Sequence, residues 1–254
     1  MNGTIKISII TVCYNAENTL KKTIESVISQ DYNNIEYIII DGVSKDKTLN
    51  IINSYAGKIS KVISEPDKGI YDAMNKGIEM ATGDFIYFLG SGDYLMPNVI
   101  SIIITQLFDT KTIYYGDVIF SPINKIYDGK FSKYKLAIRN ICHQSMFFPT
   151  QILKEHPYDL KYKAYSDWLS NMFFISNGIR FFYLNTTIAK YDIGGFSESG
   201  DHVFRKAQGQ FIRKYLGCRV YLYYKLRKLT IGIIKPLGII KPLGIIKSFI
   251  LHFK

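Results

Sequence analysis

Cysteine is scarce in this chain of 254 residues. The three cysteines, Cys13, Cys142 and Cys218, lie too far apart for a CxxC metal or redox motif, and an odd number cannot form a complete disulfide set. This scarcity argues against a disulfide-stabilised scaffold and favours a reducing cytoplasm.

The marks of export and of membrane spans are also missing. The N-terminus reads MNGTIKISIITV, with about seven apolar residues but neither a basic n-region nor a small-residue cleavage site, so it predicts a first strand instead of a signal peptide. The apolar runs near the C-terminus are only a few residues long between Lys and Pro, far short of the roughly 20 that span a bilayer.

Glycine-rich phosphate loops are absent from the expected places. Residues 13–20, CYNAENTL, contain no glycine, and no GxGxxG occurs in the chain. These absences argue against a nucleotidyltransferase with an N-terminal glycine loop, and they set aside a dinucleotide-dependent oxidoreductase.

Acidic residues are missing from the end of the chain. Residues 205–254 carry 12 Lys/Arg and no Asp/Glu, whereas residues 1–204 carry 20 Lys/Arg against 21 Asp/Glu. The net charge of +11 is therefore a property of the tail. A basic tail suggests an anionic surface such as lipid headgroups or nucleic acid.

Short β-branched runs alternate with amphipathic stretches through the first hundred residues, which predicts βαβ units and a mainly parallel sheet. The expected strands are 5–12, 35–40, 61–63 and 84–89, and the expected helices are 17–30, 45–55 and 69–80. Polar residues collect just after these strands, where strand ends and helix starts form a ligand crevice. Asp41 and Asp93 are expected to share that crevice.

The second half of the chain is less regular. It predicts a helix over 97–108, a strand over 112–118, an irregular stretch, a helix over 165–176, strands over 178–191, and one or two basic amphipathic helices over 204–229. We expect one domain over 1–204, with a nucleotide-binding half (1–95) and an acceptor-binding half (96–204), followed by a basic amphipathic tail (205–254). The IIKPLG repeat at 233–238 and 239–244 is too short for a β-helix core.

Two segments closely resemble family 2 glycosyltransferases. One reads ISIITVCYNAENTLKKTIESVISQDYNNIEYIIIDGVSKDKT, with a Tyr-Asn pair and an Asp-Gly-x-Ser-x-Asp-x-Thr turn; the other reads EPDKGIYDAMNKGIEMATGDFIYFLGSGDYL. Together they span residues 5–95. The resemblance implies a GT-A fold, which is α/β with a Rossmann-like, mainly parallel sheet flanked by helices. It also implies inverting transfer from a UDP- or dTDP-sugar in the synthesis of bacterial surface polysaccharide.

The resemblance implies a nucleotide site at the first strand ends. Asp41 would accept a hydrogen bond from the N3 imide of uracil or thymine, which cytosine cannot donate. The backbone near Val12 and the ring of Tyr14 would form the floor on which the base stacks. Ser91 would contribute to the same nucleotide site.

Three residues at the start of the third helix are further candidates. Lys68 is expected to meet the diphosphate, and Asp72 and Asn75 a ribose or sugar hydroxyl. The alternative for all three is a capped, solvated helix surface. Ser44 and Asp46, in the turn before the second helix, are predicted to cap backbone amides.

A diphosphate leaving group calls for a hard divalent cation, Mn²⁺ or Mg²⁺, held by few carboxylates. Where the family has an Asp-rich stretch, this chain has Gly-Ser-Gly-Asp at 90–93, which leaves Asp93 as the certain ligand. His143, in ICHQSMFF, is predicted to offset the lost carboxylate as a ligand or phosphate donor; the alternative is a structural histidine. Gln144 is expected to orient His143 or to contact the acceptor.

Asp167, in YSDWL, matches the acidic residue that the family uses as catalytic base. A carboxylate there would take the acceptor proton while C1 is attacked from the face opposite the diphosphate, which gives inversion. The alternative for Asp167 is an N-cap of the helix that follows. Trp168, the only tryptophan, is predicted to stack on the acceptor sugar or to belong to the core.

The tail mixes cationic residues with Tyr, Leu, Ile and Phe, which suits a headgroup layer. It predicts a peripheral protein at the cytoplasmic face of the plasma membrane and a lipid-linked saccharide acceptor. The rival is a non-catalytic α/β protein that binds a nucleotide, or nucleic acid through this tail. Carboxylates at family spacing would repel phosphates, so nucleic acid is not expected as a partner.

Overall fold

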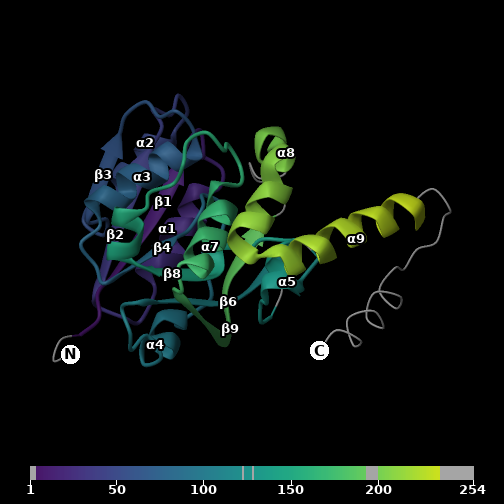
Figure 1. Cartoon of the computed structure of the whole chain (residues 1–254). Helices are drawn as coiled ribbons and strands as arrows, with labels where there is room; N and C mark the ends of the chain where they lie inside the picture. Colours follow the sequence, from purple (N-terminus) through teal and green to yellow (C-terminus); the bar gives the residue numbers. More distant parts are fainter. Residues whose placement is uncertain (1–3, 122, 128, 193–199, 235–254) are drawn as a thin grey trace.

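The computed structural model describes residues 4–121, 123–127, 129–192 and 200–234, which are arranged around one nine-stranded sheet (Figure 1). Its strand order is β3-β2-β1-β4-β8-β6-β9-β5, and β7 pairs with β6. The chain is therefore of the predicted α/β class.

The N-terminal half forms the parallel part of the sheet. Its strands are β1 (Ile7–Cys13), β2 (Ile35–Asp41), β3 (Lys61–Ser64) and β4 (Phe85–Phe88). β1 lies between β2 and β4, and Cys13 is level with Asp41. The predicted strands are thus present, and their carboxyl ends meet at one edge of the sheet.

Helices cover both faces of the sheet, which is why β1, β2 and β4 are buried along nearly their whole length. One core contains residues of α1 (Leu20–Ile28), α2 (Thr48–Ser54) and α4 (Val99–Ile104); the other contains residues of α3 (Ile70–Met80), α6 (Thr150–Glu155) and α7 (Ser166–Ser176). Alternation along β1 places Ile9 in the first core and Ile10 in the second. Each fully buried Ile or Leu stabilises the fold by about 1.5–3 kcal/mol.

A glycine brings α3 close to the sheet. A Cβ atom on Gly77 would lie 2.5 Å from Cγ2 of Ile10, so any larger residue there would push α3 away from β1. This close approach fixes the start of α3, including Tyr71, at the carboxyl edge of the strands.

The second half adds antiparallel pairs. It contains β5 (Tyr94–Leu95), β6 (Thr112–Ser121), β7 (Lys125–Tyr127), α5 (Lys133–Leu136), a 3-10 turn (His143–Ser145), β8 (Met146–Pro149) and β9 (Arg180–Asp192). β6 and β9 are parallel, whereas β8 is antiparallel to β4 and β6. The stretch predicted to be irregular, between 118 and 143, contains β7 and α5, whose three and four residues are too few to show a hydrophobic period.

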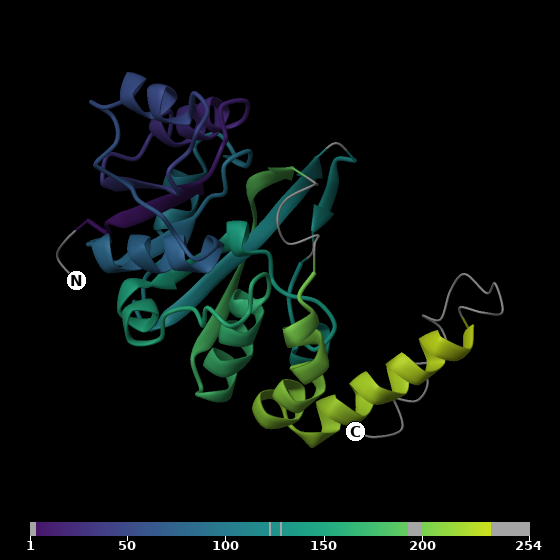
Figure 2. The same ribbon diagram turned by 90° about the horizontal axis from the view of Figure 1, so that it is seen from above.

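The chain continues through α8 (His202–Phe211), a π-helical turn (Ile212–Leu216) and α9 (Cys218–Ile234), where basic helices are predicted. Phe204 of α8 is fully buried, whereas α9 projects from the rest of the molecule (Figure 2). Among the described residues, no helix combines the length and apolarity that a bilayer span requires. Residues 235–254, with most of the repeat, lie outside the described residues.

Candidate active site

A cavity of about 720 Å³ opens where the strands of the first half end. Val12, Ser91 and Asp93 line it from the first half of the chain, and His143, Gln144, Asp167 and Trp168 line it from the second half. The fold thus brings seven of the predicted site residues, separated by up to 156 positions, around one space.

Asp167 occupies the first turn of α7, on the wall of this cavity, and is 7% exposed. Its Oδ1 accepts hydrogen bonds from the Tyr71 hydroxyl (2.7 Å) and the Trp168 amide (2.8 Å), and its Oδ2 accepts one from Asn140 Nδ2 (2.7 Å). The carboxylate is therefore held from α3 and from the segment before the 3-10 turn, in addition to one amide in the first turn of α7.

Burial raises the pKa of Asp167 from its ordinary 3.8 to about 6, although the hydrogen bonds from Tyr71, Trp168 and Asn140 lower it. The low-dielectric surroundings disfavour the charged form more than these donors favour it. The group is ionised at neutral pH and is a stronger base than an exposed aspartate. This combination suits proton abstraction from a hydroxyl.

His143 lies next to this carboxylate. Its Nδ1 is 3.8 Å from Asp167 Oδ2, and burial lowers the pKa of the imidazole to about 4. The histidine is therefore neutral at pH 7 and adds no positive charge to offset Asp167. Its predicted role as a metal ligand stays a prediction.

Asp93 follows a loop whose glycines give its side chain room. A Cβ atom on Gly90 would lie 2.8 Å from Asp93 Oδ2. Gln144 Nε2 donates to that same oxygen at 2.7 Å, and the Thr23 hydroxyl donates to the backbone carbonyl of Asp93 at 2.8 Å. Gln144 thus orients the predicted metal ligand Asp93, where it was expected to orient His143 or to contact the acceptor.

The donor set for a divalent cation is small. In the described ranges, no group of three or more His, Cys, Asp or Glu side chains is placed to hold a metal ion. Mg²⁺ commonly binds through one or two carboxylates together with substrate phosphates. Asp93 therefore fits an ion that enters with a diphosphate, and the site does not fit an ion held by protein ligands alone.

Asp41 has no exposed surface and is not among the residues that line the cavity. Its Oδ2 accepts hydrogen bonds from the Ser44 amide (3.1 Å) and the Ser64 hydroxyl (2.6 Å), and its Oδ1 accepts one from the Ser44 hydroxyl. Both oxygens thus already accept hydrogen bonds from Ser44 and Ser64, and the predicted contact between Asp41 and a base stays a prediction. Ser44 has the structural role expected of it.

The three candidates at the start of α3 do not line the cavity. Both amide atoms of Asn75 bond the backbone of Tyr158 at 2.9 Å, and Asp72 accepts the Lys68 amide at 2.9 Å and lies 3.9 Å from Lys76. Lys68 itself is exposed. These contacts favour the alternative, a capped helix surface, and a role of Lys68, Asp72 and Asn75 in donor binding stays a prediction.

Asp67 is a residue that the sequence analysis missed. A Cβ atom on Gly42 would lie 2.6 Å from Asp67 Oδ2 and 3.3 Å from Tyr14 Cδ2, so glycine lets these two side chains approach each other. Tyr14 is 61% exposed, and Asp67 Oδ1 accepts the Gly69 amide at 2.8 Å. Within the described residues, Oδ2 accepts no hydrogen bond. The available signal was the EPDKG motif, which places Asp67 three residues after the end of β3.

Trp168 belongs mainly to the core. It is 3% exposed, stacks on Phe204 with ring centroids 5.3 Å apart, and donates from Nε1 to the Leu136 carbonyl at 2.7 Å. Trp168 also lines the cavity, where the guanidinium of Arg205 lies over its ring. The geometry favours the core role over direct stacking on a sugar.

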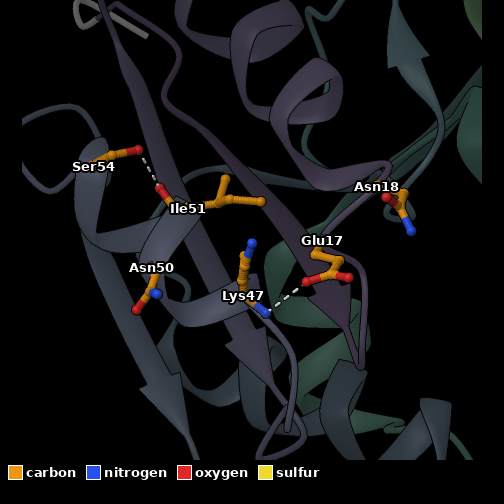
Figure 3. A pocket seen from close by; sticks show the side chains of 6 residues that line it. All are labelled: Glu17, Asn18, Lys47, Asn50, Ile51 and Ser54. Carbon is orange, nitrogen blue, oxygen red and sulfur yellow. Dashed lines mark hydrogen bonds between the residues drawn. The ribbon is translucent and has the colours of Figure 1, made fainter.

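A second, smaller pocket of about 390 Å³ lies between the segment before α1 and helix α2 (Figure 3). Its one carboxylate, Glu17, already accepts the Lys47 amide at 2.9 Å. None of its lining residues belongs to the larger cavity. We therefore place the chemistry in the larger one.

A solved structure of Staphylococcus aureus TarS (residues 1–349) in complex with UDP matches with a TM-score of 0.65 and 17% identity, covering 84% of this chain and 71% of that one. A mannosyltransferase from Pyrobaculum calidifontis, in complex with GDP-Man and Mn²⁺, matches with a TM-score of 0.62 and 14% identity, covering 84% and 64%. At this identity the likeness establishes the fold, which is the GT-A fold of glycosyltransferases, as predicted.

The sequence profile described as "Glycosyl transferase family 2" matches residues 8–181. A relative named "PGL/p-HBAD biosynthesis glycosyltransferase" in Mycobacterium bovis is 32% identical over 204 residues, or 76% of this chain and 79% of the relative. An uncharacterized glycosyltransferase of Rickettsia typhi is 36% identical over 141 residues, which are 52% of this chain and 44% of the relative. The chain is thus an enzyme of glycosyl transfer, and it belongs to glycosyl transferase family 2.

Proposed function

We propose that this enzyme transfers a sugar, with inversion, from a UDP- or dTDP-sugar to a hydroxyl of a lipid-linked saccharide in the synthesis of bacterial surface polysaccharide. The observation that carries the proposal is Asp167, a buried carboxylate with raised pKa on the wall of the cavity that Asp93 also lines. The complexes of structural neighbours with UDP and GDP-Man support a nucleotide-sugar donor.

In this mechanism the acceptor oxygen forms a bond to C1 of the donor sugar while its proton passes to Asp167. The bond between C1 and the diphosphate oxygen breaks, and the nucleoside diphosphate leaves with the electron pair. Attack from the opposite face inverts the configuration at C1. When bound, a divalent cation would offset the charge on the leaving diphosphate, and Asp93 is the residue that would hold it.

Tyr14 and Asp67 are proposed to recognise the base. The exposed Tyr14 ring offers an aromatic surface for a flat heterocycle. Asp67 Oδ2, beside that ring and Gly42, is placed to accept the N3 proton of uracil or thymine. Cytosine has no proton at N3, so the site is expected to discriminate against it.

Calorimetric titration with UDP and CDP, in the presence of Mn²⁺, tests this base site. The unaltered protein is expected to bind UDP more tightly than CDP. Asp67→Ala is expected to weaken UDP binding by about 10- to 100-fold, the size of a lost charge-assisted hydrogen bond, while leaving CDP binding little changed. Asp72→Ala is the matched control, because Asp72 also accepts an amide in the same loop region. Equal affinity of the unaltered protein for both nucleotides would contradict the proposal.

The proposed membrane contact rests on α9. Leu222, Leu226 and Leu229 are spaced along one helix face and are 60%, 49% and 60% exposed. Basic residues flank them, and helices α8 and α9 contain no acid. An apolar stripe edged by cations suits the anionic headgroup layer of a bilayer.

Flotation of the full chain with vesicles of phosphatidylglycerol and phosphatidylethanolamine tests this contact. Changing Leu222, Leu226 and Leu229 together to Gln is expected to reduce binding by about tenfold or more, because less apolar surface enters the headgroup region. Ile102→Gln with Phe108→Gln removes exposed apolar surface near α4 and is expected to have no effect. Undiminished flotation of the leucine variant would rule out α9 as the docking surface.

A further inference from the structure

Arg205 brings a positive charge to the second half of the cavity. It lies in the first turn of α8, and its side chain lines the cavity. The centre of its guanidinium is 4.7 Å from the Tyr165 ring and 5.1 Å from the Trp168 ring. Two aromatic rings therefore hold the cation in a defined place.

The guanidinium of Arg205 also donates hydrogen bonds to neutral groups. Arg205 Nη1 donates to Gln208 Oε1 at 3.0 Å, and Nη2 donates to the Tyr165 hydroxyl at 3.3 Å. Across the described part of the chain, no carboxylate oxygen lies within 4.0 Å of its guanidinium nitrogens. The charge of Arg205 is thus on the cavity lining, and no anion among the described residues neutralises it. A planar guanidinium with free N–H groups binds phosphate oxygens with good geometry.

The position of Arg205 favours the acceptor as the source of the phosphate. Val12, Ser91 and Asp93, which line the cavity from the ends of β1 and β4, form the side assigned to the donor. Arg205 instead belongs to α8, which packs Phe204 against Trp168 of α7, the helix that also carries Asp167. A group bound by Arg205 is therefore on the side from which the acceptor hydroxyl approaches the base.

The same helical segment also carries the proposed membrane contact. α8 leads through the π-helical turn into α9, whose exposed leucines face outward. An acceptor anchored in a bilayer by its lipid would enter the cavity past these helices.

Resting on the proposed function, we infer that Arg205, held over Tyr165 and Trp168, binds a phosphate group of the acceptor. The acceptor class is then a saccharide joined to its lipid through phosphate, and a neutral glycolipid would lack the group that this residue recognises.

Fluorescence of Trp168 provides the readout, because it is the only tryptophan of the chain and Arg205 lies over its ring. The probe is farnesyl diphosphate, with farnesol as its uncharged counterpart, titrated into the full chain saturated with UDP. The unaltered protein is expected to bind the diphosphate and to bind farnesol at least tenfold more weakly. Arg205→Gln is expected to weaken diphosphate binding by about 10- to 100-fold. Lys206→Gln removes the same charge one residue away, outside the cavity lining, and is expected to leave binding unchanged.

Each other result overturns the inference. No diphosphate binding by the unaltered protein, or equal binding by Arg205→Gln with an unchanged melting temperature, would show that Arg205 does not hold this anion. Competition between farnesyl diphosphate and UDP would assign Arg205 to the donor diphosphate. UDP affinity, measured calorimetrically on the same samples, tests the proposed transfer from a nucleotide sugar. If UDP still binds and farnesyl diphosphate does not, only the inference about the acceptor fails.

Discussion

Replacing Asp167 with asparagine is expected to lower kcat by about 10²- to 10⁴-fold, the usual contribution of a positioned general base. Asparagine has nearly the same shape but cannot take the acceptor proton. UDP affinity is expected to stay within about twofold, because the donor side of the cavity is untouched. Sugar transfer and UDP binding, measured on one preparation, separate the chemical step from donor binding.

The same substitution is expected to leave the fold at least as stable at pH 7. Because the pKa of Asp167 is raised in the folded state, the folded protein binds this proton more tightly than the unfolded chain does, and stability falls as pH rises from about 4 to about 6. The charged form therefore costs on the order of 3 kcal/mol above pH 6. Asparagine removes that cost.

The surrounding amides can adapt to the new NH₂ group. In the native arrangement Asn140 Nδ2 donates to Asp167, and Asn171 Nδ2 donates to Asn140 Oδ1 at 2.9 Å. Within the described residues, Asn171 Oδ1 is buried without a hydrogen-bond partner, so turning both amides lets Asn140 accept from residue 167 and donate to Asn171. In Asp167→Ala no such rearrangement is possible, and the Tyr71 hydroxyl and Asn140 lose their hydrogen-bond partner. Each unsatisfied group lowers the free energy of unfolding by about 1–3 kcal/mol.

Thermal unfolding and a pH profile complete the test. Asp167→Asn is expected to melt at or above the temperature of the unaltered enzyme, and Asp167→Ala below it. In the unaltered enzyme, kcat is expected to rise with pH through about 6, as Asp167 loses its proton. An asparagine variant that keeps more than a tenth of kcat would remove Asp167 from the role of base.

The first half of the fold was predictable because its signals are local. Each strand and helix between residues 5 and 89 has its own hydrophobic period, and polar residues directly follow the strands. Asp93 and Asp167, which both line the cavity, could be named as candidates because each lies in a contiguous motif. The partners of Asp167 could not be assigned, since Tyr71 and Asn140 come from distant segments and meet it only in the folded chain.

Asp41 shows what the end of a strand does not reveal in the sequence. Its place at the end of β2 predicts a ligand contact. In the folded chain, two serines donate hydrogen bonds to its carboxylate: Ser44 in the next turn and Ser64 at the end of β3. Their donors satisfy the carboxylate internally, and the open carboxylate is that of Asp67, one loop further along. A strand end identifies the edge of the sheet, but burial decides which of its side chains face the ligand.

Replacing Asp93 with asparagine is expected to abolish the effect of Mn²⁺ on UDP affinity and to lower kcat by at least about 100-fold. The leaving diphosphate then loses the cation that offsets its charge. The amide carbonyl of asparagine still accepts the hydrogen bond from Gln144 Nε2, so the local structure is expected to persist. UDP titrations with and without Mn²⁺ give the measurement.

The loss of kcat and of the Mn²⁺ effect is expected to be large because the loop offers few other side chains that could bind the ion. Gly90 and Gly92 provide no ligand, and Ser91 is neutral, so Asp93 is the one carboxylate of this loop. Ser91→Ala, two residues away on the same cavity wall, is the matched control and is expected to keep most of the Mn²⁺ effect. If Mn²⁺ strengthens UDP binding equally in Asp93→Asn and in the unaltered enzyme, the ion has other ligands. His143→Ala is then the variant that should lose the effect, because His143 is the other predicted metal ligand on the cavity wall.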